Sequence, residues 1–212
     1  MRNKKTSNLV IAAIFIAIIL LLAFTPGLGY IPLGAIRVTT IHIPVIIGAA
    51  LLGPKYGATF GFVFGLTSFI NNTISPIATS FVFTPFYSIG EVKGNFWSIV
   101  ICFLPRILIG VVSYYVFDFV KRILKQKKGN ITISFIFAGI AGSLTNTILV
   151  MNMIYIFFGK QYSNAIGKAY HALYSVIIGV IGFNGVLEAI TAAVIVSAVG
   201  TVLFKVKKTY TY

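Results

Sequence analysis

Residues 8–24 read NLVIAAIFIAIILLLAF, an apolar run that follows the basic residues Arg2, Lys4 and Lys5. A helix needs about 20 residues to cross a hydrocarbon core of about 30 Å, and this run comes close to that length. The segment Phe24-Thr25-Pro26-Gly27 offers no small-x-small cleavage site, so we expect a retained first helix rather than a signal peptide.

Five further apolar stretches follow the first along the chain. Together they predict an all-α fold, an integral membrane bundle of six transmembrane helices that forms one domain over residues 1–212. The second and third stretches look short for a span and the last two look long. These stretches are 36–52, 57–70, 96–119, 131–158 and 172–204.

Basic residues crowd onto alternate junctions between these stretches. If the N-terminus is inside, the outer side and outer half of the membrane keep only Arg37, Lys93, Arg106, Lys160 and Lys168 of the 17 Lys and Arg residues. This asymmetry follows the positive-inside rule, so we expect both chain ends in the cytoplasm. The inner junctions carry Arg2, Lys4, Lys5, Lys55, Lys121, Arg122, Lys125, Lys127, Lys128, Lys205, Lys207 and Lys208.

The composition excludes several classes of protein. The chain is 58% hydrophobic and 9% charged, with mean hydropathy +0.98, which a water-soluble domain would not tolerate. The net charge of +14 argues little for nucleic-acid binding, because the cations lie beside spans, where they meet anionic lipid headgroups. The lone Cys102 cannot form an internal disulfide and reads as a small hydrophobe.

Motifs for chemistry are missing from the sequence. There is no GxxxxGK[ST] phosphate loop, no HExxH, no GxSxG and no pair of intramembrane carboxylates. Of the three acidic residues only Glu188 lies deep in a span. We therefore expect no enzyme, no cofactor and no metal site, but a chain that can build a pocket without an energy source of its own.

The connections on the outer side are longer than those on the inner side. The outer loops cover 25–35, 71–95 and 159–171, and the first two are rich in Gly, Pro and aromatic residues. Structured loops of this kind commonly close over a ligand, which we expect here. The alternative is that they are long linkers.

Polar residues in five helices share one depth. Counted at about 1.5 Å per residue from the inner end of its helix, each of five residues lies roughly 20–26 Å up. A charge at that depth is costly unless it faces a cavity or a partner, so we expect the group to converge on one pocket. The five residues are His42, Asn71, Arg106, Asn146 and Glu188, with Asn184 one turn from Glu188 near the outer boundary.

Each of these residues also has a structural interpretation. Arg106 could reach outward to the headgroups, and Glu188 could form a structural ion pair with it. His42 could be a packing histidine that hydrogen-bonds a helix backbone. Asn146 and Asn152 are six residues apart, so we expect only one of them to reach a pocket.

Two helix faces carry small residues that allow close packing against another helix. Gly57, Gly61 and Gly65 form a double GxxxG that we expect to pack internally. Ala13 and Ala17 form a second small-residue face, which could pack internally or receive another membrane subunit.

Several segments resemble the substrate-binding S components of the energy-coupling-factor (ECF) vitamin transporters, over nearly the whole chain. The more specific segments are Leu52-Gly-Pro-Lys-Tyr-Gly-Ala58 and Leu104-Pro-Arg-Ile-Leu-Ile-Gly110, and the pattern around the second of them and around Thr40–Gly48 is most similar to the pantothenate type. The acidic residue expected of riboflavin-type members after the first outer loop is replaced by Thr39-Thr40. Ala13–Ala17 and Asn184–Ala189 also resemble the family.

This resemblance implies six helices, an outer-leaflet vitamin pocket closed by the loop after the first helix, and partners that supply the energy. Those partners are a membrane-embedded T subunit and two cytoplasmic ATPases. The pocket layer and its rim hold two Arg against one Glu, so with His42 neutral the charge favours an anion such as pantothenate over cationic thiamine. The alternatives are an S component for riboflavin, folate or hydroxymethylpyrimidine, or a free-standing small permease. Candidate substrate-binding residues are Tyr30, Arg37, His42, Asn71, Arg106, Asn146, Asn184 and Glu188, and candidate partner-binding residues are Ala13 and Ala17.

Overall fold

The computed structural model describes residues 4–33, 36–90, 92–125 and 127–210. Most of them are helical: α1 (Lys4–Phe24), α2 (His42–Leu52), α3 (Pro54–Ile74), α4 (Phe96–Ile123), α5 (Asn130–Ala165), α6 (Leu173–Val180) and α7 (Val186–Tyr210). Two 3₁₀ turns, η1 (Ser80–Val82) and η2 (Tyr170–Ala172), and a π-helical segment, η3 (Ile181–Gly185), complete the helical part. Two antiparallel hairpins pair β1 (Tyr30–Leu33) with β2 (Ile36–Thr39) and β3 (Ser88–Ile89) with β4 (Val92–Lys93).

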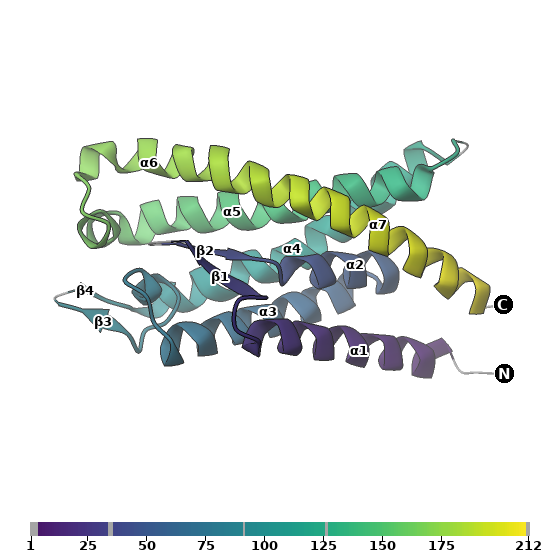
Figure 1. Cartoon of the computed structure of the whole chain (residues 1–212), viewed down its shortest axis with the longest axis horizontal. Coiled ribbons are helices and arrows are strands. Elements are labelled where there is room, and N and C mark those ends of the chain that lie inside the picture. The colour runs from purple at the N-terminus through teal and green to yellow at the C-terminus, as the bar shows by residue number, and fades with distance from the viewer. Residues whose placement is uncertain (1–3, 34–35, 91, 126, 211–212) are drawn as a thin grey trace.

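The helices run side by side along the long axis of the molecule, and α6, η3 and α7 continue one another as a single rod (Figure 1). Within the described residues this makes six helical rods. Four of them are long and apolar enough to cross a membrane, namely Lys5–Phe24, Phe96–Ile123, Asn130–Ala165 and Tyr170–Lys208. Both chain ends lie at one end of the bundle and both hairpins lie toward the other (Figure 1).

The second predicted span is only partly helical. Residues 36–39 form strand β2, and the helix starts at His42 and ends at Leu52. Eleven residues rise about 16 Å, roughly half of a hydrocarbon core. The hydropathy pattern could not separate the two parts, because Ile36, Val38 and the following isoleucines are as apolar in a strand as in a helix.

The fifth rod is longer than the sequence predicts. The apolar pattern ends at Phe158, but α5 continues to Ala165 across a kink at Phe158, whose backbone angles are φ −132° and ψ 15°. The third outer loop, predicted to begin at Gly159, is therefore helical in its first half. Tyr162, in the two turns of α5 after the kink, is buried.

The glycine face of α3 packs internally, as predicted. A Cβ built on Gly61 would lie 2.2 Å from the carbonyl oxygen of Arg106, and one on Gly57 would lie 2.8 Å from that of Gly110. Only hydrogen atoms fit in this space, so α3 and α4 approach backbone to backbone beside Arg106. The turn before α3 explains the Gly-Pro segment, because Gly53 takes a positive φ of +107° and Pro54 starts the helix.

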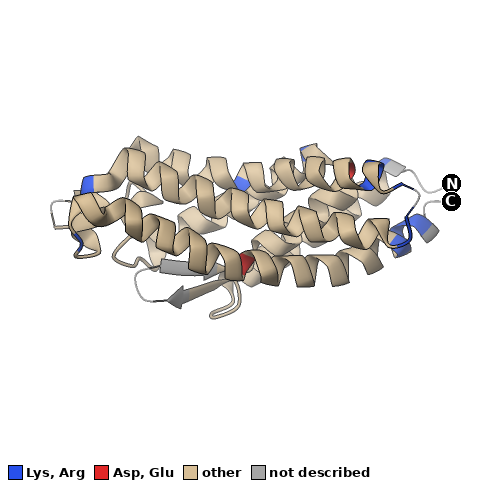
Figure 2. Ribbon diagram, turned by 90° about the horizontal axis from the view of Figure 1, so that it is seen from above, with Lys and Arg blue, Asp and Glu red and all other residues tan. Residues whose placement is uncertain are grey.

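Two hydrophobic clusters fill the interior. The terminus-side cluster joins α1, α2, α3, α4, α5 and α7, and it includes Phe15, Phe60, Phe64, Phe117 and Phe135. The loop-side cluster joins η1, α4, α5 and α6, and it includes Phe81, Ile101, Ile154, Phe158 and Leu173. Lys and Arg gather most densely at the end where the chain begins and ends (Figure 2).

Candidate substrate-binding pocket

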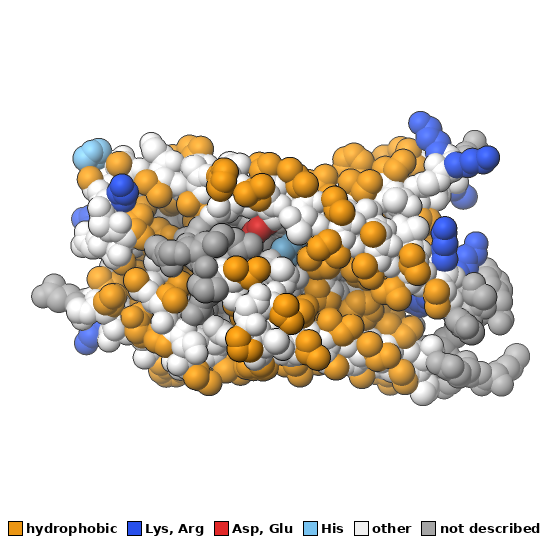
Figure 3. Space-filling model, viewed as in Figure 1, with side chains coloured by type: hydrophobic (Ala, Val, Ile, Leu, Met, Phe, Trp, Pro, Cys, Tyr) orange, Lys and Arg blue, Asp and Glu red, His pale blue; other side chains and the backbone are white. Residues whose placement is uncertain are grey.

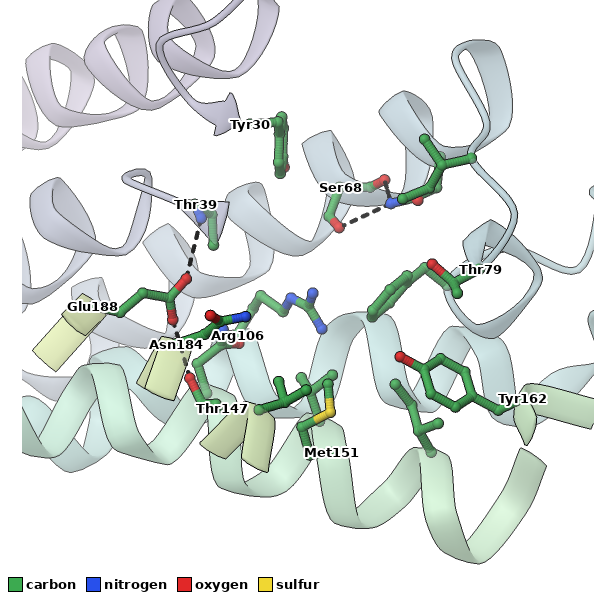
Figure 4. Close-up of a pocket in the computed structure, with 17 residues that line it drawn as sticks. Tyr30, Thr39, Ser68, Thr79, Arg106, Thr147, Met151, Tyr162, Asn184 and Glu188 are labelled. Atoms are coloured by element: carbon green, nitrogen blue, oxygen red, sulfur yellow. Dashed lines mark hydrogen bonds between the residues drawn. The ribbon is translucent and has the colours of Figure 1, made fainter. Parts of the chain in front are cut away.

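A pocket lies between the two clusters and draws its walls from β1, β2, α3, α4, α5, α6, η3 and α7 (Figure 4). It holds about 790 Å³ of space not occupied by atoms, its mouth included. One wall is apolar, with Val150, Met151 and Ile154 from α5. The other lining residues are Tyr30, Thr39, Ser68, Asn72, Ile77, Thr79, Phe83, Arg106, Asn146, Thr147, Tyr162, Val180, Asn184 and Glu188.

Arg106 is held in the pocket by its helix. Pro105 has no N–H, so the carbonyl of Ile101 lacks its usual helical donor. The Arg106 guanidinium takes that place, with Nη1 donating to Ile101 O at 2.7 Å, and it also lies 4.9 Å from the ring centre of Phe83. The side chain is buried and Nε has no hydrogen-bond partner. A buried guanidinium with an unpartnered N–H donor can form a charge-assisted hydrogen bond to an anion.

Glu188 is the second charged group in the pocket. Its carboxylate accepts hydrogen bonds from the backbone N–H of Thr39 at 3.3 Å and from Thr147 Oγ1 at 3.1 Å. Among the residues that the structure describes, the one ion pair joins Arg122 to Asp118, so Glu188 and Arg106 do not form the structural ion pair that the sequence allowed. Glu188 instead fixes the end of β2 to α5 and α7.

Two asparagines complete the polar part of the lining. Asn184 lies in η3, one turn before Glu188, and both line the pocket, as their spacing predicted. π-Helical segments widen a helix locally and often occur at functional sites. Asn146 is buried on α5, and its Oδ1 has no hydrogen-bond partner. Asn152 does not line the pocket and donates to the carbonyl of Ile148, which confirms that only one of the two asparagines on α5 reaches the pocket.

Tyr30 lines the pocket from strand β1. Its hydroxyl lies 3.0 Å from Thr67 Oγ1 in a shared hydrogen bond. Burial raises the pKa of the Tyr30 phenol, so the group stays neutral. Tyr30 also lines a second cavity toward the end of α1, together with Thr25, Asn71 and Ser75. Tyr30 therefore borders both spaces.

Two predicted residues do not line the pocket, and the side chain of a third is not described. His42 starts α2 and is buried with Nε2 unpartnered, but it does not line the pocket. Asn71 points to the second cavity, because its neighbour Asn72 takes the pocket side of α3. Arg37 belongs to β2, and its side chain lies outside the described part of the structure.

Sequence reasoning missed several lining residues. Asn72 is fixed by bonds to Ser68 O at 2.8 Å and from Ser80 Oγ at 2.7 Å, and the Ser68–Asn72 spacing of one turn could have indicated a polar face. Thr147 follows Asn146 directly. Tyr162 had no signal, since the predicted helix ended before it. The described residues hold no group of three or more His, Cys, Asp or Glu that could bind a metal ion.

Comparison with known proteins identifies the family of this chain. Residues 7–200 match the family described as ECF transporter, substrate-specific component. The chain is similar to the pantothenic acid transporter PanT of Lactococcus lactis subsp. cremoris, with 38% identity over 91% of this chain and 98% of the relative. It is also similar to the pantothenate transporter PanT of Leuconostoc mesenteroides subsp. mesenteroides, with 36% identity over 96% of this chain and 95% of the relative. This multi-pass membrane protein therefore belongs to the substrate-specific components of ECF transporters.

Proposed function

We propose that the chain is the high-affinity substrate-binding subunit of an ECF-type importer for pantothenate. The observation that carries the proposal is the buried Arg106 guanidinium, which lines the pocket with Nε unpartnered. Pantothenate carries one carboxylate, and a guanidinium binds a carboxylate through two parallel charge-assisted bonds. The names of the two similar transporters point to the same vitamin.

The rest of the ligand also matches the lining. Pantothenate has two hydroxyls and an amide, which need donors and acceptors such as Asn184, Asn146 and Glu188. Its two methyl groups suit the apolar wall of Val150, Met151 and Ile154. Asn146 Oδ1 has no hydrogen-bond partner within the protein and would gain one from a ligand donor.

The orientation of the protein follows from its charges. The end of the bundle that carries both chain ends also carries the basic junctions, so it faces the cytoplasm of the cell in whose membrane the protein lies. The hairpins and the pocket then lie toward the outer side. The vitamin is bound from outside, and the loop with β1 and β2 closes over it.

Transport depends on partner subunits, because the chain has no motif for ATP hydrolysis. The Ala13/Ala17 face of α1 is exposed, and the neighbouring Ala12 is the one that packs in the core. A membrane-embedded T subunit docks on this exposed small-residue face, and two ATPases act through it.

A pair of alanine variants tests the docking role. Ala13→Trp keeps T-subunit helices from approaching, so uptake and co-purification of the partners should fail while the purified subunit still binds vitamin. Ala198→Trp is the matched control, because Ala198 is also an exposed alanine, on α7. Normal uptake by Ala13→Trp would dismiss the docking role.

Calorimetric titration of the purified subunit tests the substrate. Pantothenate should bind at least a hundredfold more tightly than riboflavin, folate, thiamine or hydroxymethylpyrimidine, and native mass spectrometry should find it among co-purified ligands. Tighter binding of one of the other vitamins would reassign the pocket. Uptake into vesicles by the subunit alone would instead indicate a free-standing permease.

A further inference from the structure

The pocket has polar groups on both sides of Arg106. Figure 4 shows Glu188 and Asn184 on one side of this residue, with the guanidinium directed away from Glu188. Thr79 and Tyr162 lie on the other side (Figure 4). Among the described residues that line the pocket, Arg106 and Glu188 are the charged ones. On the face shown in Figure 3, Lys and Arg gather at the ends of the molecule and hydrophobic side chains cover most of its middle. The two charged lining residues therefore decide how an anion lies in the pocket.

The side chain of Tyr162 ends in a hydroxyl group without a hydrogen-bond partner. Tyr162 is 3% exposed and lines the pocket, and its hydroxyl makes no hydrogen bond to the described residues. Its oxygen is directed into the pocket, toward Arg106 (Figure 4). A polar group that stays unpaired in a buried position costs free energy, so this hydroxyl is suited to donate to a ligand.

The surroundings of Tyr162 fix its position. Phe158, one turn earlier at the kink of α5, is fully buried and packs edge to face on Phe81, with 5.8 Å between the ring centres. The ring of Tyr170 covers Gly159, where an added Cβ would lie 2.9 Å from Cε2 of that ring. These contacts hold the part of α5 that carries Tyr162. A hydroxyl presented by a fixed side chain loses little conformational entropy when it binds a ligand.

We propose that the substrate carboxylate is bound between Arg106 and Tyr162, and that the substrate hydroxyls lie at Glu188 and Asn184. The ionised carboxylate of Glu188 can only accept hydrogen bonds, so it pairs with hydroxyl donors and repels a second carboxylate. Tyr162 donates its O–H to the anion that the guanidinium binds, and such a charge-assisted bond is about twice as strong as a neutral one. The assignment rests on the proposed function and adds the orientation of the vitamin and a second residue that selects for its carboxylate.

A comparison of two ligands tests this orientation. Pantothenol differs from pantothenate at one end, where a hydroxymethyl group replaces the carboxylate. Tyr162→Phe should weaken pantothenate binding about tenfold or more, as expected for a lost hydrogen bond to a charged group, and pantothenol binding about fivefold or less. Asn184→Ala should weaken both ligands by the same factor, because the end of the ligand at Asn184 is common to them. Calorimetric titration measures each affinity.

Tyr155→Phe is the matched control for Tyr162→Phe. Tyr155 lies on the same helix, does not line the pocket and stacks its ring on that of Tyr170, so this variant should bind both ligands like the parent protein. An equal loss for both ligands in Tyr162→Phe, or no loss, would overturn the assignment and leave the proposed function standing. So would a loss in Asn184→Ala that is confined to pantothenate, since it indicates the reverse orientation. A parent protein that binds neither ligand would instead contradict the proposed function.

A structure of the parent protein with bound pantothenate answers the same question without a substitution. One carboxylate oxygen should lie about 2.5–3.0 Å from Tyr162 Oη. A carboxylate found beside Asn184, with the hydroxyls of the vitamin at Tyr162, would overturn the assignment.

Discussion

The terminus-side half of the bundle and the loop-side half are both apolar, yet their interiors are filled differently. In the terminus-side half, aromatic rings pack on one another, with the centres of Phe117 and Phe135 only 4.6 Å apart, and Lys121 lies over Phe117 and Phe204. Toward the loops, the cluster around Phe81 and Phe158 stops short of α3, and the pocket occupies the space between.

Buried polar groups show what this difference means. Side-chain atoms of Arg106 and Asn146 are buried in the pocket without hydrogen-bond partners. An unsatisfied buried polar group costs about 1–3 kcal/mol, so Arg106 and Asn146 are groups that a bound ligand would stabilise. Three further buried atoms without hydrogen-bond partners, His42 Nε2, Ser113 Oγ and Ser143 Oγ, belong to residues that do not line the pocket, so a ligand in the pocket would not meet them.

The largest expected effect of a single change falls on Arg106. Arg106→Ala removes the charge-assisted contact and should weaken pantothenate binding by about 1.5–3 kcal/mol, or roughly 10- to 150-fold. Arg106→Lys should weaken it as well, because an ammonium cannot form two parallel bonds. Calorimetric titration measures both.

Arg122→Ala is the matched control for Arg106, because Arg122 lies exposed at the terminal end, paired with Asp118. Exposed ion pairs contribute little to stability, so Arg122→Ala should bind pantothenate with the affinity of the parent protein. Unchanged affinity in Arg106→Ala would remove this residue from the site and with it the main support for an anionic ligand.

Glycines offer a second contrast between the halves. A Cβ on Gly110 would lie 2.1 Å from the carbonyl oxygen of Gly57, whereas one on Gly179 of α6 would meet nothing within 4 Å. Gly110→Ala should destabilise the protein by about 1–3 kcal/mol through overpacking. Gly179→Ala should stabilise it by about 0.4–1 kcal/mol, since the helix accepts a side chain there. Thermal melts in detergent should give shifts of opposite sign, and equal shifts would contradict the contrast.

The sequence predicts the terminus-side half better than the loop-side half. Hydropathy, glycine spacing and charge depend on local patterns, so the apolar rods and the α3–α4 contact could be read from residues such as Gly57 and Gly61. Depth counting also selected Arg106, Asn146 and Glu188, because a polar residue deep in an apolar helix has few explanations, and the one-turn spacing from Glu188 added Asn184. The same count selected His42 and Asn71, which do not line the pocket.

Other features of the loop-side half could not be read in this way. Strand β2 looks like a helix by hydropathy, and the continuation of α5 beyond the kink at Phe158 to Tyr162 lies outside the apolar pattern. Whether Asn71 or Asn72 faces the pocket depends on the rotation of α3, which the tight packing of its glycines on α4 sets. Neighbouring residues on a helix differ by about 100° in direction, so the predicted residue Asn71 lines the second cavity and Asn72 lines the pocket.

A smaller effect is expected at Glu188, where the pocket meets the hairpin. Glu188→Gln keeps the shape but loses the charge-assisted bonds to Thr39 N–H and Thr147, which should cost about 1 kcal/mol, or about fivefold in vitamin affinity. The melting temperature should fall too, and saturating vitamin should recover part of the loss by mass action. If Glu188→Gln melts and binds like the parent protein, Glu188 neither holds the hairpin nor contacts the ligand.

The smallest expected effect belongs to Tyr30, which lines both the pocket and the second cavity. Tyr30→Phe keeps the ring and removes only the hydrogen bond to Thr67, worth about 0.5–1.5 kcal/mol. If that bond holds the ring across the mouth, its loss should speed both binding and release of the vitamin and leave the equilibrium affinity almost unchanged. Thr67→Val removes the same bond from the other side and should give the same rates. Stopped-flow binding measures both variants. A fall in affinity with unchanged release from Tyr30→Phe alone would show that the hydroxyl contacts the ligand directly and that the ring is not a barrier between the two spaces.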